Sequence, residues 1–193
     1  MLPEVASGSL DMRAIVQPLR VSLKRTHVVL GEVSAVDIAA RIVKVDLAVL
    51  GTQAVLPFDH LVFALGSESS THGIPGIAEH AYLLKTLPDA ARLRARVGSA
   101  FEAAAAEHDR AERDRWLRFV IAGGGFTGVE AAGELAGFVK RLHRYYPTLH
   151  DLTPEIVLLE SGHRLVEQLT PDFGKRAAAS LRARNVRIEL GED

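Results

Sequence analysis

Cysteine is absent from the sequence, and this absence excludes several kinds of site. No disulfide framework, thiolate metal site or cysteine nucleophile can exist within these 193 residues. The eight histidines have no spacing typical of metal ligands, so we expect no metal site. The lack of cysteine is also consistent with a cytosolic protein.

A large net charge and a long hydrophobic run are absent as well. The 23 basic and 24 acidic residues leave a formal net charge of −1. No overall field favours nucleic acid or an anionic membrane, and we expect no nucleic-acid partner. No apolar run approaches the roughly 20 residues of a membrane span, and the N-terminus does not have the pattern of a signal peptide. The composition is 48% hydrophobic, which is enough for a sizeable core.

Strand signals dominate the stretch from residue 28 to residue 66. The segment "RIVKVD" alternates apolar and charged residues, as a strand with one solvated face does. The Gly51-Thr52 pair that follows predicts the turn of a hairpin or short meander. The "VVL" run before Gly31 is a further short β-rich segment. "FDHLVFALGS" is almost continuously apolar, which predicts a strand buried on both faces.

A change of composition then divides the chain. The segment "GSESSTHGIPGIAEHA" concentrates Gly, Ser and Pro, and we place a domain boundary near residue 75. From about Asp89 to Arg113, apolar residues recur at spacings of three to four. This pattern predicts one long helix, with Pro88 in its first turn.

The C-terminal half alternates strand and helix patterns. "WLRFVIAG" and "EIVLLE" are apolar runs of the buried-strand type, and "VRIEL" is a third strand. A helical pattern begins at about Thr127, and a second follows Thr170, with Pro171 at its first position. The fold class is therefore α/β: a Rossmann-like, parallel βαβαβ mononucleotide-binding half.

Between the first of these strands and its helix lies a glycine-rich loop, "GGGFTG". Gly123 permits the tight turn out of the strand, Gly125 lets a pyrophosphate approach the backbone, and Gly128 lets helix and strand pack closely. The first N–H groups of the helix have no intrahelical partners and, with the helix dipole, form an anion site. The candidate pyrophosphate-binding residues are Gly123, Gly124, Gly125, Phe126, Thr127 and Gly128.

Three acidic residues that follow this loop in the sequence are candidates for contacts with the nucleotide. Glu160 ends the next strand, where a carboxylate can accept hydrogen bonds from the adenosine ribose and repel a 2′-phosphate, so NAD is favoured over NADP. Arg164, four residues later, is a weak argument for NADP. Glu130 and Glu134 stabilise the start of the helix electrostatically, and the sharper alternative is that Glu130 faces the nicotinamide.

Several of these segments together carry a family resemblance. "GGGFTGVEAAGEL", "VVLGEVSAVD", "FDHLVFALGS" and "LLKTLPDAARLR" occur in an order that resembles the type II NADH dehydrogenases, flavoproteins with two dinucleotide-binding domains. The resemblance covers nearly the whole chain and is more specific than the glycine motif alone. It implies an internal or truncated segment of such an enzyme.

The resemblance also implies a reaction and its residues. In the family, NADH gives a hydride to FAD, and reduced FAD gives electrons to a quinone. Glu130 matches the glutamate near the flavin–nicotinamide contact, and Glu160 matches the acid that ends the next strand. Backbone near the flavin nucleotide is matched by Val33, Ala64, Leu65 and Gly66.

The implied organisation is a partial FAD-binding domain with a β-meander at 1–75 and an NAD(H)-binding Rossmann-like domain at 76–193, incomplete at its C-terminal end. The complete enzyme would be cytoplasmic and peripheral to the inner membrane face, touching the membrane only through regions absent here. Pairing of the incomplete sheet with a second copy would give a homo-oligomer. Two alternatives stay open, a non-catalytic NAD(H)-binding module and a reductase of the ferredoxin or nitrite type.

Overall fold

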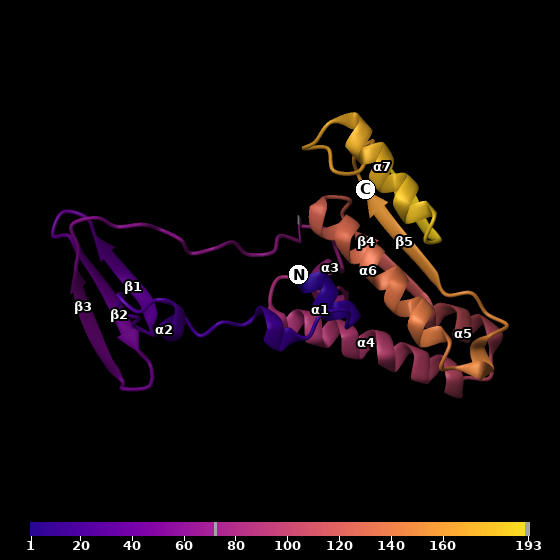
Figure 1. Ribbon diagram of the computed structural model, residues 1–193, viewed down its shortest axis with the longest axis horizontal. Helices are drawn as coiled ribbons and strands as arrows, with labels where there is room; N and C mark the ends of the chain where they lie inside the picture. The colour runs from indigo at the N-terminus through magenta and orange to yellow at the C-terminus, as the bar shows by residue number, and fades with distance from the viewer. Residues whose placement is uncertain (72, 192–193) are drawn as a thin grey trace. The chain divides into compact units, whose positions relative to one another are not determined.

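The computed structural model describes residues 1–71 and 73–191. These residues form two compact units, which are described separately below and labelled in Figure 1. One unit is Val16–Glu68. The other joins Met1–Ile15 to the described residues from Ser69 onward.

The unit Val16–Glu68 is built on an antiparallel sheet. Its strands are β1 (Glu32–Asp37), β2 (Ile42–Leu47) and β3 (Thr52–Pro57), paired in the order β1-β2-β3. A short helix, α2 (Leu19–Ser22), precedes them. The predicted meander is confirmed, with Gly51 in a left-handed conformation (φ 63°) at the β2–β3 turn.

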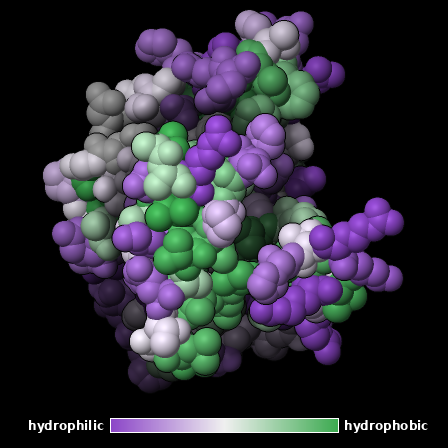
Figure 2. Space-filling view, turned by 90° about the vertical axis from the view of Figure 1, so that its left-hand side faces the viewer, coloured by the Kyte–Doolittle hydropathy of each residue, from purple (hydrophilic) through white to green (hydrophobic). Residues whose placement is uncertain are grey.

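Most hydrophobic side chains of this unit are exposed. Val45 is its one buried hydrophobic residue, and it lies under Gly31, where a Cβ would come within 2.5 Å of its side chain. Figure 2 shows hydrophobic residues gathered in an exposed strip bordered by hydrophilic ones. The prediction of a strand buried on both faces at "FDHLVFALGS" is wrong. Residues 58–66 form no strand, and Val62 is 84% exposed, because no described strand lies beside them to pair with their backbone.

The other unit contains the predicted parallel sheet. Strands β4 (Arg118–Ala122), β5 (Glu155–Glu160) and β6 (Val186–Leu190) pair in parallel in the order β4-β5-β6. Helices α6 (Phe126–His143) and α7 (Pro171–Arg182) form the two connections between them. The α/β fold class and the βαβαβ order are therefore confirmed.

The apolar stripe of α6 makes the core with the sheet. Ala132, Ala136 and Val139 are buried, and Val129 and Leu142 pack partly buried against the same cluster. The spacing of three and four places these residues on one helix face, as the sequence predicts.

The long helix predicted over 89–113 is two helices. These are α4 (Leu87–Ala106) and α5 (Arg110–Trp116). The chain breaks between them because the Asp109 carboxylate accepts hydrogen bonds from two backbone N–H groups at the start of α5, as an N-cap does. Trp116, expected to begin a strand, ends α5 instead, and β4 starts two residues later.

An N-terminal helix that shows no clear period in the sequence packs on this unit. Helix α1 (Leu2–Ser7) lies against α4 and α6, and its Val5 and Ala6 are buried with Ala90 of α4. This packing is why the observed units differ from the expected division at residue 75, because residues 1–15 belong with the parallel sheet.

The remaining elements are short. They are α3 (Ile77–His80) and the 3-10 turns Met12–Ile15 and Pro147–Leu149. Among residues 1–71 and 73–191, no helix combines the length and the apolar character needed to cross a membrane.

Polar contacts fix α1 on α6. Ser7 Oγ and Ser9 Oγ lie 2.5 and 2.8 Å from Glu134 Oε2, and Arg141 Nη2 donates to the Ser7 carbonyl at 2.9 Å. Ser7 is 3% exposed, so losing its acceptor leaves a buried hydroxyl without a charged partner. Glu134 therefore accepts both serine hydroxyls of this docking, and Arg141 adds a third polar contact.

Replacing Glu134 by alanine is expected to lower the free energy of unfolding of this unit by about 1–3 kcal/mol. The matched control is Glu102→Ala, which removes the bond that Glu102 accepts from the Tyr146 hydroxyl and touches nothing on α1. Hydrogen exchange at residues 5–10 is the measurement. Those amides should lose protection in the first variant and keep it in the second. Equal protection in both would contradict the role given to Glu134.

Candidate nucleotide-binding site

The glycine-rich loop lies at the carboxyl end of β4, directly before α6 (Figure 1). Gly123 has φ +103°, a conformation that strains any residue with a Cβ, and its N–H donates to the Leu159 carbonyl at 2.9 Å. A Cβ on Gly128 would lie 1.8 Å from the Gly123 carbonyl oxygen. Gly123 thus provides the turn and Gly128 the close packing that the motif predicts.

Gly125 has a different environment. It is the N-cap of α6, in an extended conformation (φ −72°, ψ −172°), and a Cβ built on it meets no atom within 4 Å. The first helical hydrogen bond runs from Val129 N–H to the Gly125 carbonyl, so the N–H groups of Phe126 and Thr127 precede the helical ladder. Open space beside backbone donors at a helix N-terminus fits a pyrophosphate.

Glu160 reaches the loop from the end of β5. One carboxylate oxygen accepts a hydrogen bond from Gly124 N–H, and the other accepts from Gly162 N–H at 2.7 Å. The Ser161 hydroxyl also donates to this second oxygen, at 3.5 Å. A carboxylate has about four acceptor positions, so the oxygen bonded to Gly124 N–H retains capacity for a ribose hydroxyl. The structure therefore brings together Glu160 and the glycine loop, which the sequence places 36 positions apart.

The loop between β5 and α7 forms a further side of the site. Sequence reasoning considered Arg164 of this loop but missed Leu165 and Val166. Leu165 is 1% exposed, and a Cβ on Gly124 would come within 2.6 Å of its side chain. Val166 N–H donates to the Gly124 carbonyl at 2.9 Å. The apolar pair Leu165-Val166, within the otherwise polar segment "SGHRLVEQ", was the available signal.

The backbone of Val166 and the side-chain bonds of Arg164 are two further features of this loop. Val166 has φ +46°, which is a strained conformation for a β-branched residue. The Arg164 guanidinium donates to the carbonyls of Leu169 and Glu167 at 2.8 and 2.7 Å. Its donors are thus directed to carbonyls of its own loop.

Glu130 lies one turn before Glu134 on α6 and is exposed. Both carboxylates line a hollow between α1, α6 and α7, with Glu4 on the α1 side and Arg184 beyond the end of α7. No described contact of Glu130 assigns it a role, and its place beside nicotinamide stays a prediction.

The residues matched to flavin contacts lie in the other unit. Val33 is half-exposed in β1, where it pairs with Val45. Ala64, Leu65 and Gly66 lie in an irregular, exposed segment, and Gly66 has φ +77°. Accessible backbone is what the predicted contacts require, and these contacts stay predictions.

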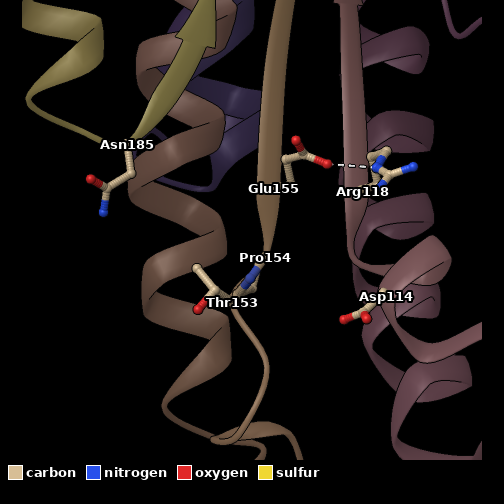
Figure 3. A pocket seen from close by; sticks show the side chains of 6 residues that line it. All are labelled: Asp114, Arg118, Thr153, Pro154, Glu155 and Asn185. Carbon is tan, nitrogen blue, oxygen red and sulfur yellow. Dashed lines mark hydrogen bonds and ion pairs between the residues drawn. The ribbon is translucent and has the colours of Figure 1, made fainter. Parts of the chain in front are cut away.

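A second hollow opens at the opposite end of the parallel sheet (Figure 3). Glu155, at the amino end of β5, pairs with Arg118 of β4 at 2.6 Å, the dashed line in Figure 3, and with Arg187 of β6 at 3.2 Å. Ligands of open parallel sheets bind at the carboxyl ends of the strands, so the glycine loop is the favoured site.

No group of three His, Cys, Asp or Glu residues that could hold a metal ion occurs in the part of the chain that the structure describes.

A glycine-rich loop at the carboxyl end of a parallel βαβαβ sheet is the arrangement typical of dinucleotide-binding α/β proteins. The model of the pyridine nucleotide-disulphide oxidoreductase family matches residues 2–193. The chain belongs to that family.

Curated relatives are consistent with this membership. The chain is 36% identical to the type II NADH:quinone oxidoreductase NdhA of Mycobacterium tuberculosis over 98% of its own length and 41% of that protein. It is 34% identical to the mitochondrial external alternative NAD(P)H-ubiquinone oxidoreductase B4 of Arabidopsis thaliana, over 93% of its own length and 31% of that protein. The chain therefore spans well under half of these relatives.

Solved structures show the same fold. NDH2 of Plasmodium falciparum in complex with NADH matches with a TM-score of 0.85 and 22% identity, covering 98% of this chain and 39% of that one. The same protein in complex with RYL-552 matches with a TM-score of 0.86 and 23% identity, with the same coverage.

Proposed function

We propose that the chain is the NADH-binding part, with a portion of the FAD-binding part, of a flavoprotein oxidoreductase that passes a hydride from NADH to FAD and electrons on to a quinone. The domains are then those expected from the sequence, except that residues 1–15 pack with the NADH-binding unit, which resumes at Ser69. The quinone acceptor and a position at the cytoplasmic face of the inner membrane belong to the same proposal.

One observation carries the nucleotide part of this proposal, namely the contrast between two glycines of one loop. At Gly128 a Cβ would overlap the backbone, whereas at Gly125 it would enter empty space. Packing alone explains Gly128 and leaves Gly125 unexplained. A ligand that approaches the backbone at Gly125 explains both.

The redox part is supported by the family and by the relatives' names. FAD, when bound, would accept the hydride. The residues of this chain would bind the pyrophosphate, orient the dinucleotide and, at Glu130, border the nicotinamide. The homologous NADH:quinone oxidoreductases support the quinone as acceptor.

The decisive experiment is a titration of the full chain with NADH, followed by nucleotide fluorescence, with the visible absorption spectrum of the same sample recorded. Saturable NADH binding that ADP-ribose displaces is the expected result. Flavin absorption bands that bleach when NADH is added would also support the redox step of the proposal. A folded chain that binds neither NADH nor ADP-ribose would refute the proposal.

Nucleotide selectivity tests the role of Glu160. The chain is expected to bind NADH at least about tenfold more tightly than NADPH, since the carboxylate accepts ribose hydroxyls and repels a 2′-phosphate. Glu160→Gln should lower the ratio of the NADPH dissociation constant to the NADH dissociation constant. Arg164→Ala is the control and should leave the ratio unchanged, because its guanidinium donates to loop carbonyls. A loss of NADPH binding in Arg164→Ala would show that the arginine recognises the 2′-phosphate.

A further inference from the structure

Three backbone groups of the glycine loop are held by β5 and the loop that follows it. Gly123 N–H donates to the Leu159 carbonyl, and Gly124 N–H donates to the Glu160 carboxylate. The Gly124 carbonyl accepts a hydrogen bond from Val166 N–H at 2.9 Å. The loop is therefore bonded on one side by a single neighbouring segment.

These bonds fix the direction of the groups on the other side of the loop. In a trans peptide, the C=O and N–H of one plane point in opposite directions. Because Gly124 N–H points to Glu160, the Gly123 carbonyl points away from it, toward Gly128. Because the Gly124 carbonyl points to Val166, the Gly125 N–H points away from that loop. Gly125 N–H then joins the donors at the start of α6.

The surroundings hold this arrangement firmly. Leu165 and Val166 are 1% and 3% exposed, and Leu165 packs under Gly124. A Cβ on Gly174, in the first turn of α7, would come within 2.6 Å of the Leu165 carbonyl oxygen, so α7 packs directly on the loop. Val166 has a positive φ in the conformation that directs its N–H to the Gly124 carbonyl, and a positive φ is strained for a β-branched residue.

We propose that Glu160 and Val166 are positioning residues that set two peptide planes of the glycine loop and so aim the Gly125 N–H at the pyrophosphate. The proposal rests on the proposed function and adds to Glu160 a role besides ribose recognition. The carboxylate acts on the phosphate site through Gly124, without touching the phosphate.

Inorganic pyrophosphate is the probe that separates the two roles, because it has no ribose. If Glu160 served the ribose alone, its removal would leave pyrophosphate binding unchanged or improve it, since a negative charge near the anion is lost. The positioning role instead predicts that two neutral variants differ in their affinity for pyrophosphate. Glu160→Gln retains an oxygen that accepts from Gly124 N–H, whereas Glu160→Ala does not.

We expect Glu160→Gln to bind pyrophosphate at least about fivefold more tightly than Glu160→Ala, as the loss of one orienting hydrogen bond implies. The amide resonance of Gly125, followed by NMR, should shift with pyrophosphate in wild type and Glu160→Gln and show a reduced shift in Glu160→Ala. Glu155→Gln, at the opposite end of β5, is the matched control and should bind as wild type.

Equal pyrophosphate affinities in the alanine and glutamine variants, with an unchanged Gly125 shift, would overturn the proposal. Replacing the Val166 amide by an ester removes its N–H alone, and it should weaken pyrophosphate binding without a change of side chain. Unchanged binding in the ester would remove Val166 from the proposal. If the folded wild type binds neither pyrophosphate nor NADH, the proposed function itself fails, and the positioning role fails with it.

Discussion

Gly125→Val is expected to remove NADH binding and leave the fold intact. The backbone at Gly125 is extended, a conformation that valine adopts readily, and the added Cβ meets no protein atom within 4 Å. The free energy of unfolding should therefore stay within about 1 kcal/mol of wild type. The side chain fills the space that the pyrophosphate would occupy, so the NADH affinity should fall by about 100-fold or more.

Calorimetric titration with NADH and urea unfolding of the same samples measure both parts of this result. Gly98→Ala in α4 is the matched control. Its Cβ also meets nothing within 4 Å, and Gly98 lies outside the glycine loop. It should bind NADH as wild type. A Gly125→Val protein that binds NADH normally would show that the pyrophosphate lies elsewhere.

Gly128→Ala is expected to have the reverse profile, with the fold itself affected. Its Cβ would lie 1.8 Å from the Gly123 carbonyl oxygen, which is backbone and cannot rotate away. Either the turn opens or α6 moves away from β4. The expected loss of stability is about 1–3 kcal/mol or more, together with loss of NADH binding.

The control for this variant is on the same helix. Gly137→Ala would place a Cβ 3.3 Å from Nη1 of Arg141, whose Nη2 donates to the Ser7 carbonyl. Only a side-chain end has to shift slightly, so stability should stay within about 1 kcal/mol of wild type. The urea midpoints of the two variants make the comparison. Equal stability of Gly128→Ala and wild type would mean that the close contact between loop and helix is not required.

Much of the fold was predictable because its signals are local. Alternation in "RIVKVD", the apolar stripe of α6 and Pro171 at the start of α7 all depend on neighbouring residues, and all three are confirmed. The helix break before Arg110 was missed because a strong helical composition on both sides obscured one N-capping residue, Asp109.

The failures concern long-range packing. "FDHLVFALGS" is apolar enough for a buried strand, but burial requires neighbouring strands, and the described residues supply none. The docking of α1 depends on Ser7 meeting Glu134, 127 positions away, and no periodicity reports such a pair. In the site, the glycine spacing gave the loop, whereas the bonds from Glu160 and Val166 to Gly124 appear only once β5 lies beside β4.

The docking of α1 has a consequence for how the chain folds. The parallel unit is interrupted in the sequence by Val16–Glu68. Docking α1, which ends at Ser7, on α4, which begins at Leu87, therefore closes an excursion of roughly 80 residues. Closing so long a loop is an entropic penalty, and shortening it tenfold would reduce that penalty by about 2 kcal/mol. The α1 contacts should therefore form late, after the βαβαβ core, whose connections are local. Replacing the excursion by a short linker should accelerate that last step.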